Sequence, residues 1–202
     1  MNKKVLVLAA NEVELKWIHE VKGAHFATVG VGKVLSAVNA IMCVQREKPD
    51  HVLLVGWSGA VDPSFSLGEG FWGSSCVQYD IDLRSFKVPR GMVPDGKKSQ
   101  VGPLPLSFPS EARTAVLGTA DRFLLRDYRE ANPWISEELS ISLSDMESYG
   151  VAYAMQQLNV PLSIYRVVSD DSKGHRPKKF GAFMKESGLL FRSALETLEN
   201  KG

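Results

Sequence analysis

Short apolar runs typical of β-strands alternate along the chain with segments in which apolar residues recur at helical spacing. The strands are expected at residues 4–9, 25–31, 51–56, 70–79, 112–117 and 162–168. Helices are expected to begin near residue 12, to cover 33–45 and 146–158, and to end the chain over 180–198. This alternation predicts an α/β fold in which helices pack on a sheet.

Two of these segments carry a prediction about burial. Residues 51–56 are apolar at successive positions, so both faces of that strand should be covered, as in an internal strand. In the helix at 33–45, Val34, Val38 and Met42 recur at helical spacing. We therefore expect this helix to pack in the core.

The composition changes between residues 80 and 110, where prolines, glycines and charged residues gather. Such a composition indicates an ordered loop or flap, and long loops in compact domains are usually functional. The sequence contains no repeat, low-complexity tract or linker that would divide it. Residues 1–202 are therefore expected to form a single domain, with a flap loop around 80–110.

Charge and hydropathy exclude several classes of protein. A formal charge of +1 provides no overall field that would attract nucleic acid or an anionic membrane. No apolar stretch approaches the roughly 20 residues that cross a bilayer. The apolar run near the N-terminus is too short for a signal peptide and is followed by Glu12 and Glu14. Neither nucleic acid nor a membrane is expected as a partner.

The two cysteines, Cys43 and Cys76, lie in apolar segments without metal-ligand spacing. Such residues usually act as small core side chains in a reducing compartment. The expected location is the cytoplasm.

Polar residues gather where the predicted strands end, which is where open α/β sheets bind ligands. Glu14 follows the first strand, Trp57-Ser58-Gly59 the third, and Ser169-Asp170 the last. Asp145 and Glu147 open the helix that precedes the last strand.

Each of these residues also has a purely structural interpretation. Glu14, Asp145 and Glu147 are acids near helix starts, where the helix dipole favours them. Asp170 can be a turn or N-cap residue. Residues 30–33 suggest a phosphate loop only weakly, because the rest of such a motif is absent, and a structural turn explains them better.

Taken together, these residues and their neighbours follow an ordered set of motifs. The first half contains Ala10-Asn11-Glu12-Val13-Glu14, Gly30-Val31-Gly32-Lys33, Gly56-Trp57-Ser58-Gly59-Ala60 and Tyr79-Asp80-Ile81-Asp82. The second half contains Asp145-Met146-Glu147-Ser148, Asn159-Val160-Pro161 and Arg166-Val167-Val168-Ser169-Asp170. In this order the chain resembles the purine nucleoside phosphorylase and nucleosidase superfamily, and within it the methylthioadenosine/S-adenosylhomocysteine nucleosidases.

The resemblance implies a three-layer α/β fold with a central mixed, twisted sheet flanked by helices. It also implies hydrolysis of the N-glycosidic bond of methylthioadenosine, S-adenosylhomocysteine or 5′-deoxyadenosine, giving adenine and the ribose derivative. Such a reaction serves nucleoside catabolism and methionine salvage. It requires a proton for the leaving purine and a water on the opposite face of the sugar, as in inverting glycosidases.

The resemblance assigns the catalytic roles to three residues. Asp170 is the expected general acid at purine N7, and its pKa should be raised by a dry pocket. Ser169 is expected to orient Asp170, and Glu14 to hold and activate the water.

The remaining site residues are expected to bind substrate. Glu147 should accept hydrogen bonds from the ribose hydroxyls, with Met146 against the sugar and Arg166 nearby. Phe123 matches the residue that stacks on the base, and Leu124 the one whose backbone contacts the base edge. Asp145, Val31, Trp57, Ser58 and Gly59 complete the predicted pocket. Phe86 and Pro94 match flap residues that reach the neighbouring subunit's site, which implies a homodimer.

The sequence also departs from the family pattern. Trp57 replaces a serine, Asn11 a methionine, Tyr79 a histidine and Asp145 a glutamate. The bulky Trp57 ring is expected to reshape the pocket near the sugar. These departures leave the preferred substituent on the 5′ carbon open.

Three other functions remain open. A futalosine hydrolase or other purine nucleoside hydrolase would share the fold, as would a purine nucleoside phosphorylase. A phosphorylase needs arginines around its phosphate, whereas the first loop has none and brings Glu14 instead. A non-catalytic nucleoside-binding protein, with Trp57 closing the pocket, would bind adenosine analogues without releasing free base.

No metal or other cofactor is implied, because His19, His25, His51 and His175 are not spaced as ligands. The basic stretch at 173–179 is expected to be a solvated loop rather than a nucleic-acid site. The expected partner is a small purine nucleoside.

Overall fold

A mixed β-sheet forms the centre of the molecule. The computed structural model describes residues 4–18, 21, 23–96 and 99–199. The strands of the sheet are β1 (Val5–Ala9), β2 (His25–Thr28), β3 (His51–Ala60), β4 (Gly70–Gln78), β7 (Leu104–Pro105), β8 (Thr114–Thr119), β9 (Leu143–Asp145) and β10 (Leu162–Asp170). Their order is β10-β4-β8-β9-β3-β1-β2, with β7 beside β4.

Part of the sheet closes on itself. β10 pairs in parallel with β3 and in antiparallel with β4. β4 continues through β8 to β9, and β9 returns to β3 in antiparallel. The ends of these strands are therefore gathered around one region, which is where the polar residues lie.

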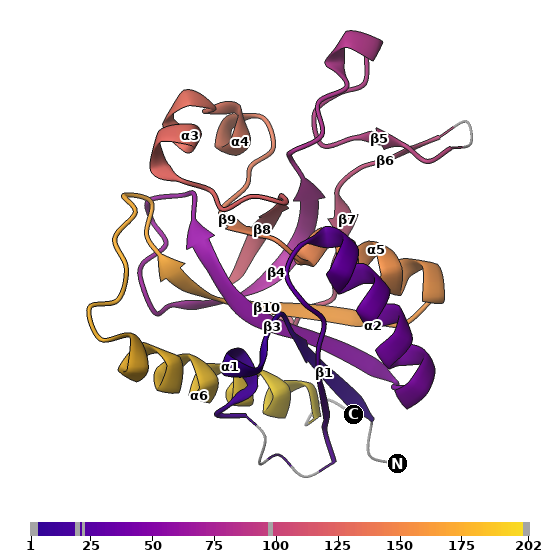
Figure 1. Ribbon diagram of the computed structural model, residues 1–202, viewed down its shortest axis with the longest axis vertical. Coiled ribbons are helices and arrows are strands. Elements are labelled where there is room, and N and C mark those ends of the chain that lie inside the picture. Colours follow the sequence, from indigo (N-terminus) through magenta and orange to yellow (C-terminus); the bar gives the residue numbers. More distant parts are fainter. Residues whose placement is uncertain (1–3, 19–20, 22, 97–98, 200–202) are drawn as a thin grey trace.

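Helices cover both faces of the sheet (Figure 1). α2 (Lys33–Glu47) and α5 (Ser148–Leu158) pack on one face, while α1 (Glu12–Leu15) and α6 (Phe180–Glu199) pack on the other. Two short helices, α3 (Arg126–Ala131) and α4 (Trp134–Glu137), follow β8. This arrangement confirms the predicted three-layer α/β fold with a mixed central sheet.

The alternation of side chains between two covered faces explains why β1 and residues 52–55 of β3 are apolar at successive positions. Leu6 and Leu54 belong to the core beneath α2 and α5, whereas Val7 and Leu53 belong to the core beneath α6. All four are fully buried. A strand covered on both faces cannot place a polar residue on either without burying it.

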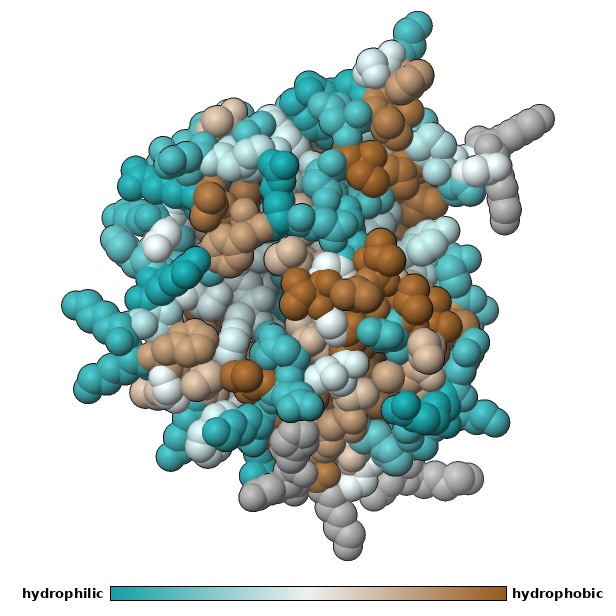
Figure 2. Space-filling model, viewed as in Figure 1, coloured by the Kyte–Doolittle hydropathy of each residue, from teal (hydrophilic) through white to brown (hydrophobic). Residues whose placement is uncertain are grey.

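The expectation that α2 packs in the core holds for only one face of the helix. Ala40, Cys43 and Val44 are buried, but Val38 and Met42 are 50% and 61% exposed. One face of the helix packs on α5 and the sheet, and its other apolar face points outward. Figure 2 shows hydrophobic residues gathered on the surface over α2.

The segment around residues 80–110 projects from the sheet (Figure 1). It contains the 3-10 turn η1 (Arg84–Phe86) and the antiparallel pair β5 (Val93–Pro94) and β6 (Gln100–Val101). We call this projecting part, the described residues 80–96 and 99–103, the flap segment. Its action as a flap remains a prediction.

Several boundaries differ from the sequence-based expectation. α5 begins at Ser148 rather than 146, because Glu147 is its N-cap, and β10 continues to Asp170. Cys43 and Cys76 are buried free thiols, as predicted. Among the described residues, no helix has the length and apolar character needed to span a bilayer.

Candidate active site

A cavity of about 250 Å³ opens where the strands end. Its wall includes twelve predicted residues: Glu14, Val31, Trp57, Ser58, Gly59, Phe123, Leu124, Asp145, Met146, Glu147, Ser169 and Asp170. Ala10, Asn11, Ala60, Arg122 and Ser144 complete it. The structure thus brings the three candidate carboxylates, Glu14, Glu147 and Asp170, to one cavity.

Three predicted site residues do not line this cavity. Arg166 is fully buried behind it. Phe86 and Pro94 lie on the flap segment, and Phe86 is 77% exposed. Within a single chain, therefore, neither Phe86 nor Pro94 covers the cavity.

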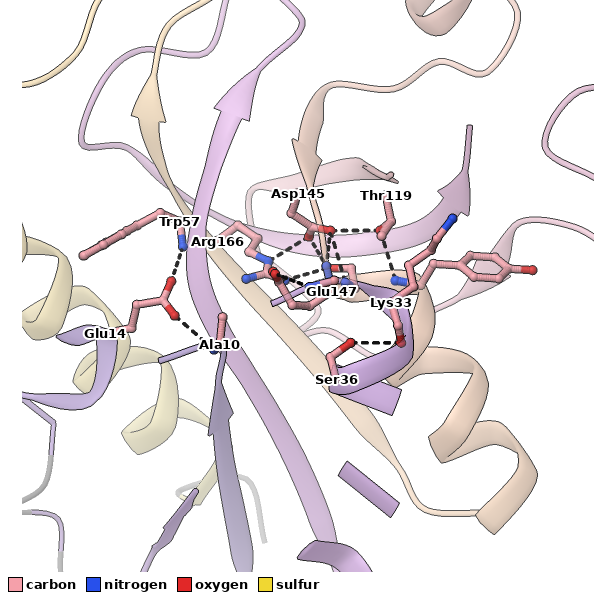
Figure 3. Close-up of polar contacts among 12 residues, drawn as sticks. Ala10, Glu14, Lys33, Ser36, Trp57, Thr119, Asp145, Glu147 and Arg166 are labelled. Carbon is pink, nitrogen blue, oxygen red and sulfur yellow. Dashed lines mark hydrogen bonds and ion pairs between the residues drawn. The ribbon is translucent and has the colours of Figure 1, made fainter. Parts of the chain in front are cut away.

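The Glu14 carboxylate is fixed by backbone N–H groups. Its Oε2 accepts hydrogen bonds from the N–H groups of Ala10 at 3.0 Å and Asn11 at 3.2 Å, and its Oε1 from that of Trp57 at 3.1 Å. Figure 3 shows Glu14 bridging the first loop and β3 in this way. Burial raises the pKa of Glu14, whereas Arg166 and the backbone donors act in the opposite direction.

Arg166, on β10, is the cation that joins the carboxylates. Its Nε lies 2.9 Å from Oδ2 of Asp145, and its Nη2 lies 3.5 Å from Oε2 of Glu147. Nη2 also donates to the Ser148 hydroxyl at 3.0 Å. A buried guanidinium needs such partners, because an unpaired buried charge is strongly destabilising.

Glycine at position 56 leaves the space that Arg166 occupies. A Cβ on Gly56 would lie 2.2 Å from Nη1 of Arg166 and 2.9 Å from Oε1 of Glu14. Any larger residue would displace both groups. The glycine of the Gly56–Ala60 motif therefore has a steric role in the site.

The Asp145 carboxylate is occupied by hydrogen bonds to neighbouring residues of the chain. It accepts hydrogen bonds from the Thr119 hydroxyl at 2.9 Å and from the N–H groups of Glu147 and Ser148, as well as from the Ser148 hydroxyl. Its side chain is 1% exposed. With Arg166 also bound to it, Asp145 holds the start of α5 in place, so we expect it to position Glu147 rather than to contact a ligand.

Glu147 combines burial with several charged neighbours. Its Oε1 accepts from the N–H of Gly32 at 3.4 Å, which brings the loop before α2 to the cavity. Burial raises the pKa of Glu147 to about 7. The negative charges of Asp145 and Glu14 also raise it, whereas the positive charge of Arg166 lowers it.

Asp170 lies at the end of β10, beside β3. The Ser169 hydroxyl donates to its Oδ1 at 2.8 Å. A Cβ on Gly59 would lie 2.5 Å from Oδ2, so glycine makes room for this carboxyl group. Burial raises the pKa of Asp170, although the Ser169 hydroxyl and the cations of Arg176 and Arg129 oppose the change.

The two aromatic residues in the wall are oriented differently. Phe123, on the loop after β8, is half exposed. The Trp57 ring packs on Phe180 and Phe183 at the start of α6, with ring centroids 5.4 and 5.6 Å apart. The bulk of Trp57 is therefore accommodated against α6, at the end of the cavity where Glu14 lies.

A charged network beside the cavity was not anticipated from the sequence. The Lys33 ammonium forms an ion pair with Asp80 and lies 3.8 Å from Asp121, while the Lys33 N–H donates to Asp121 at 2.7 Å. Asp121 directly precedes the loop that carries Arg122 and Phe123. Lys33 and Asp80 each belong to one of the sequence motifs, but their positions in the sequence do not indicate that the two side chains form an ion pair.

The described residues contain no group of three or more His, Cys, Asp or Glu side chains arranged to hold a metal ion. The polar residues of the cavity wall are four carboxylates, three serines, Asn11 and Arg122. Such a set can donate and accept protons and can bind sugar hydroxyls.

Comparison with known proteins gives this geometry a context. The model of a family described as the Phosphorylase superfamily matches residues 17–198. An aminodeoxyfutalosine nucleosidase of Campylobacter jejuni is 26% identical over 169 residues, which are 79% of this chain and 73% of that protein. A 5′-methylthioadenosine/S-adenosylhomocysteine nucleosidase of Staphylococcus aureus is 23% identical over 188 residues, covering 84% and 78%.

Solved structures share the fold. A Helicobacter pylori nucleosidase mutant with 5′-methylthioadenosine in its active site matches with a TM-score of 0.84, at 20% identity and over 100% of both chains. The native futalosine hydrolase of H. pylori matches with a TM-score of 0.83, at 21% identity, over 100% of this chain and 99% of that one.

Proposed function

Because this chain belongs to the Phosphorylase superfamily, we propose that it hydrolyses the N-glycosidic bond of 5′-modified adenosines. The substrates would be nucleosides such as 5′-methylthioadenosine, S-adenosylhomocysteine or 5′-deoxyadenosine, and the products adenine and the ribose derivative. The observation that carries the proposal is the presence of Glu14, Glu147 and Asp170 around one cavity. The S. aureus relative carries the name of this activity.

Asp170 serves as the general acid in this proposal. A carboxyl group can protonate N7 of the leaving purine only if it holds a proton when the substrate binds. Burial, which raises the pKa of Asp170, favours that protonated form. The Ser169 hydroxyl fixes the side chain, and Phe123 offers a ring on which the base can stack.

Glu14 serves as the group that holds and activates the water. Three backbone N–H groups fix both of its oxygens. A carboxylate has about four acceptor positions, so one remains for a water molecule in the cavity. Because the backbone donors lie on the first loop and β3, the carboxylate cannot turn away from the sugar site.

Glu147 binds the sugar. As a carboxylate it can accept hydrogen bonds from two ribose hydroxyls, as planar acids do in sugar sites. Met146 lies beside it in the cavity wall and provides an apolar surface for the ribose. Leu124 lies next to Phe123, where its backbone can contact the edge of the base.

The charges of the cavity favour water over phosphate as the nucleophile. Four carboxylates line the wall, and the cation buried behind them, Arg166, is already paired with Asp145 and Glu147. Arg122, also in the wall, lies beside Phe123 and packs on the Tyr128 ring at 4.3 Å. A phosphate dianion beside Glu14 would be repelled.

A futalosine-type nucleoside is the second candidate substrate. The C. jejuni relative named for aminodeoxyfutalosine supports it. Trp57 and Asn11, which line the cavity near Glu14, depart from the methylthioadenosine nucleosidase motif at the sugar end. That is where different 5′ substituents would be distinguished.

The protein is proposed to act as a homodimer in the cytoplasm. The exposed apolar face of α2, with Val34, Val38 and Met42, is suited to contact a second copy. Phe86 and Pro94 on the flap segment are available to reach the partner's cavity. The buried thiols of Cys43 and Cys76 are consistent with a reducing compartment.

Incubation with a panel of nucleosides, with and without inorganic phosphate, tests the proposal. The expected result is release of free adenine from 5′-modified adenosines at a rate that phosphate does not change. Release that depends on phosphate would show a phosphorylase. Binding of adenosine analogues without any release of base would show a binding protein.

A further inference from the structure

A second cavity, of about 340 Å³, adjoins the candidate active site. It lies between α3 and the loop that follows β10, and Phe123, Leu124 and Asp170 line both cavities. These three residues are the ones placed at the purine base by the proposed function. The second cavity therefore adjoins the position proposed for the purine base.

The wall of the second cavity carries one more cationic than anionic residue. The cavity is lined by four cationic residues, Arg126, Arg129, Lys173 and Arg176, and by three carboxylates, Asp127, Asp170 and Asp171. Arg126 is bound to Glu130 at 2.6 Å, and Asp171 accepts hydrogen bonds from His175. Among the residues that the structure describes, Arg129, Lys173 and Arg176 form no ion pair.

The protonation of Asp170 increases the imbalance. As a general acid Asp170 is neutral when the substrate binds, which leaves the carboxylates of Asp127 and Asp171 facing the three cations that form no ion pair with a described residue. Two of these cations are directed to the base end of the site. Nη1 of Arg129 donates to the backbone oxygen of Ala60 at 3.2 Å, and the Arg176 guanidinium lies 5.1 Å from the centre of the Phe123 ring.

We infer that this cavity is a subsite for a carboxylate-bearing substituent on the purine, attached at the exocyclic position of C6. The inference rests on the proposed function for the orientation of the base. In a purine, the C6 substituent lies on the same edge as N7, so a group attached there extends past the Asp170 carboxyl group. Arginine and lysine are pure donors, and arginine can bind a carboxylate through two parallel hydrogen bonds.

A bound carboxylate would also assist the proposed chemistry. Arg129 and Arg176 oppose the protonation of Asp170. A negative charge placed between them and Asp170 would offset this effect. An acidic substituent would therefore improve both binding and the supply of the proton.

The test compares two synthetic nucleosides of nearly equal size, N6-(carboxymethyl)adenosine and its neutral amide, N6-(carbamoylmethyl)adenosine. Binding is measured by calorimetry in a Glu14→Gln background, which slows hydrolysis and lies outside the second cavity. We expect the acid to bind at least about tenfold more tightly than the amide, the effect of one charge-assisted hydrogen bond. Lys173→Met combined with Arg176→Met should bring the two affinities within about twofold.

Arg192→Met is the matched control, because Arg192 pairs with Glu196 on α6 and does not line the cavity. It should leave the preference for the acid unchanged. Equal affinities for acid and amide, or a preference that survives the double substitution, would overturn the inference. If the acid binds more tightly but no nucleoside yields free base, the proposed function fails and the subsite stands. If adenosines are cleaved while acid and amide bind equally, the subsite alone fails.

Discussion

At the scale of single residues, burial raises the pKa of both Asp170 and Glu14, but the two carboxyl groups are held by different hydrogen-bond donors. Asp170 rests on a hydroxyl donor in a buried position, while Glu14 is held by three backbone N–H groups. Both kinds of donor favour the ionised form, and three of them act on Glu14 whereas one acts on Asp170. This difference suits the roles proposed for them, with Asp170 as the proton donor and Glu14 as the group that holds the water.

Asp170→Asn should remove most of the turnover and retain nucleoside binding, because the amide keeps the shape but cannot donate the proton. General acids typically contribute about 10²–10⁴-fold. Steady-state assays of base release, together with calorimetry, measure the two effects. Asp50→Asn, at the opposite end of the strands, is the control and should turn over normally. Near-normal turnover in Asp170→Asn would refute the assignment.

The raised pKa of Glu147 predicts how stability depends on pH. An acid whose pKa rises from 4.5 in the unfolded chain to about 7 in the folded protein binds its proton more tightly when folded. Its contribution is therefore complete below about pH 4.5 and is lost as the pH rises toward 7, by up to about 3 kcal/mol. Glu147→Gln should reduce this loss. Denaturant unfolding of both proteins between pH 4.5 and 7.5 measures it, and parallel pH profiles would contradict the account.

At the scale of elements, β3 passes close to Glu14 and to Asp170, the two carboxyl groups proposed for catalysis. Gly56→Ala would place a Cβ 2.2 Å from the Arg166 guanidinium. Overpacking of this kind usually costs about 1–3 kcal/mol, and here it would also displace Arg166 from its carboxylates. We expect lower thermal stability and lower activity. Gly181→Ala on α6 is the control, since a Cβ there meets nothing within 4 Å, and an equal loss in both variants would argue against a specific role for Gly56.

The elements differ in how far the sequence predicts them. β1, β3 and β10 were predicted because both of their faces are largely buried, so most of their positions are apolar. The short β9, α3 and α4 were missed, because three to six residues have no periodicity and depend on tertiary packing.

The candidate site was predicted mainly through the motifs rather than through physical rules. Residue type alone gave Glu14, Glu147 and Asp170 ordinary structural explanations. Their meeting in one cavity depends on the closure of the sheet through β10 and β9, which no local pattern encodes. The pairing of Arg166 with Asp145, and the Lys33 network, likewise arise from contacts between distant segments.

At the scale of the whole molecule, no part of the described chain covers the apolar face of α2 formed by Val34, Val38 and Met42. Large exposed apolar patches usually mark interaction sites. Val38→Glu should therefore convert a dimer to monomers and lower activity, if Phe86 completes the partner's site. Light scattering after size exclusion measures the mass. Leu189→Glu, at a position on α6 that is 55% exposed, is the control, and a wild-type protein that is already monomeric would contradict the homodimer.

The central claim is that the carboxylates deliver water to the sugar while the purine leaves. The origin of the oxygen in the sugar product tests this claim most directly. The reaction is run with 5′-methylthioadenosine in ¹⁸O-labelled water, with phosphate present, and the initial products are analysed by mass spectrometry. The account predicts free adenine and a sugar that carries ¹⁸O on its anomeric carbon. A sugar 1-phosphate, or no release of adenine from any of the nucleosides tested, would contradict it.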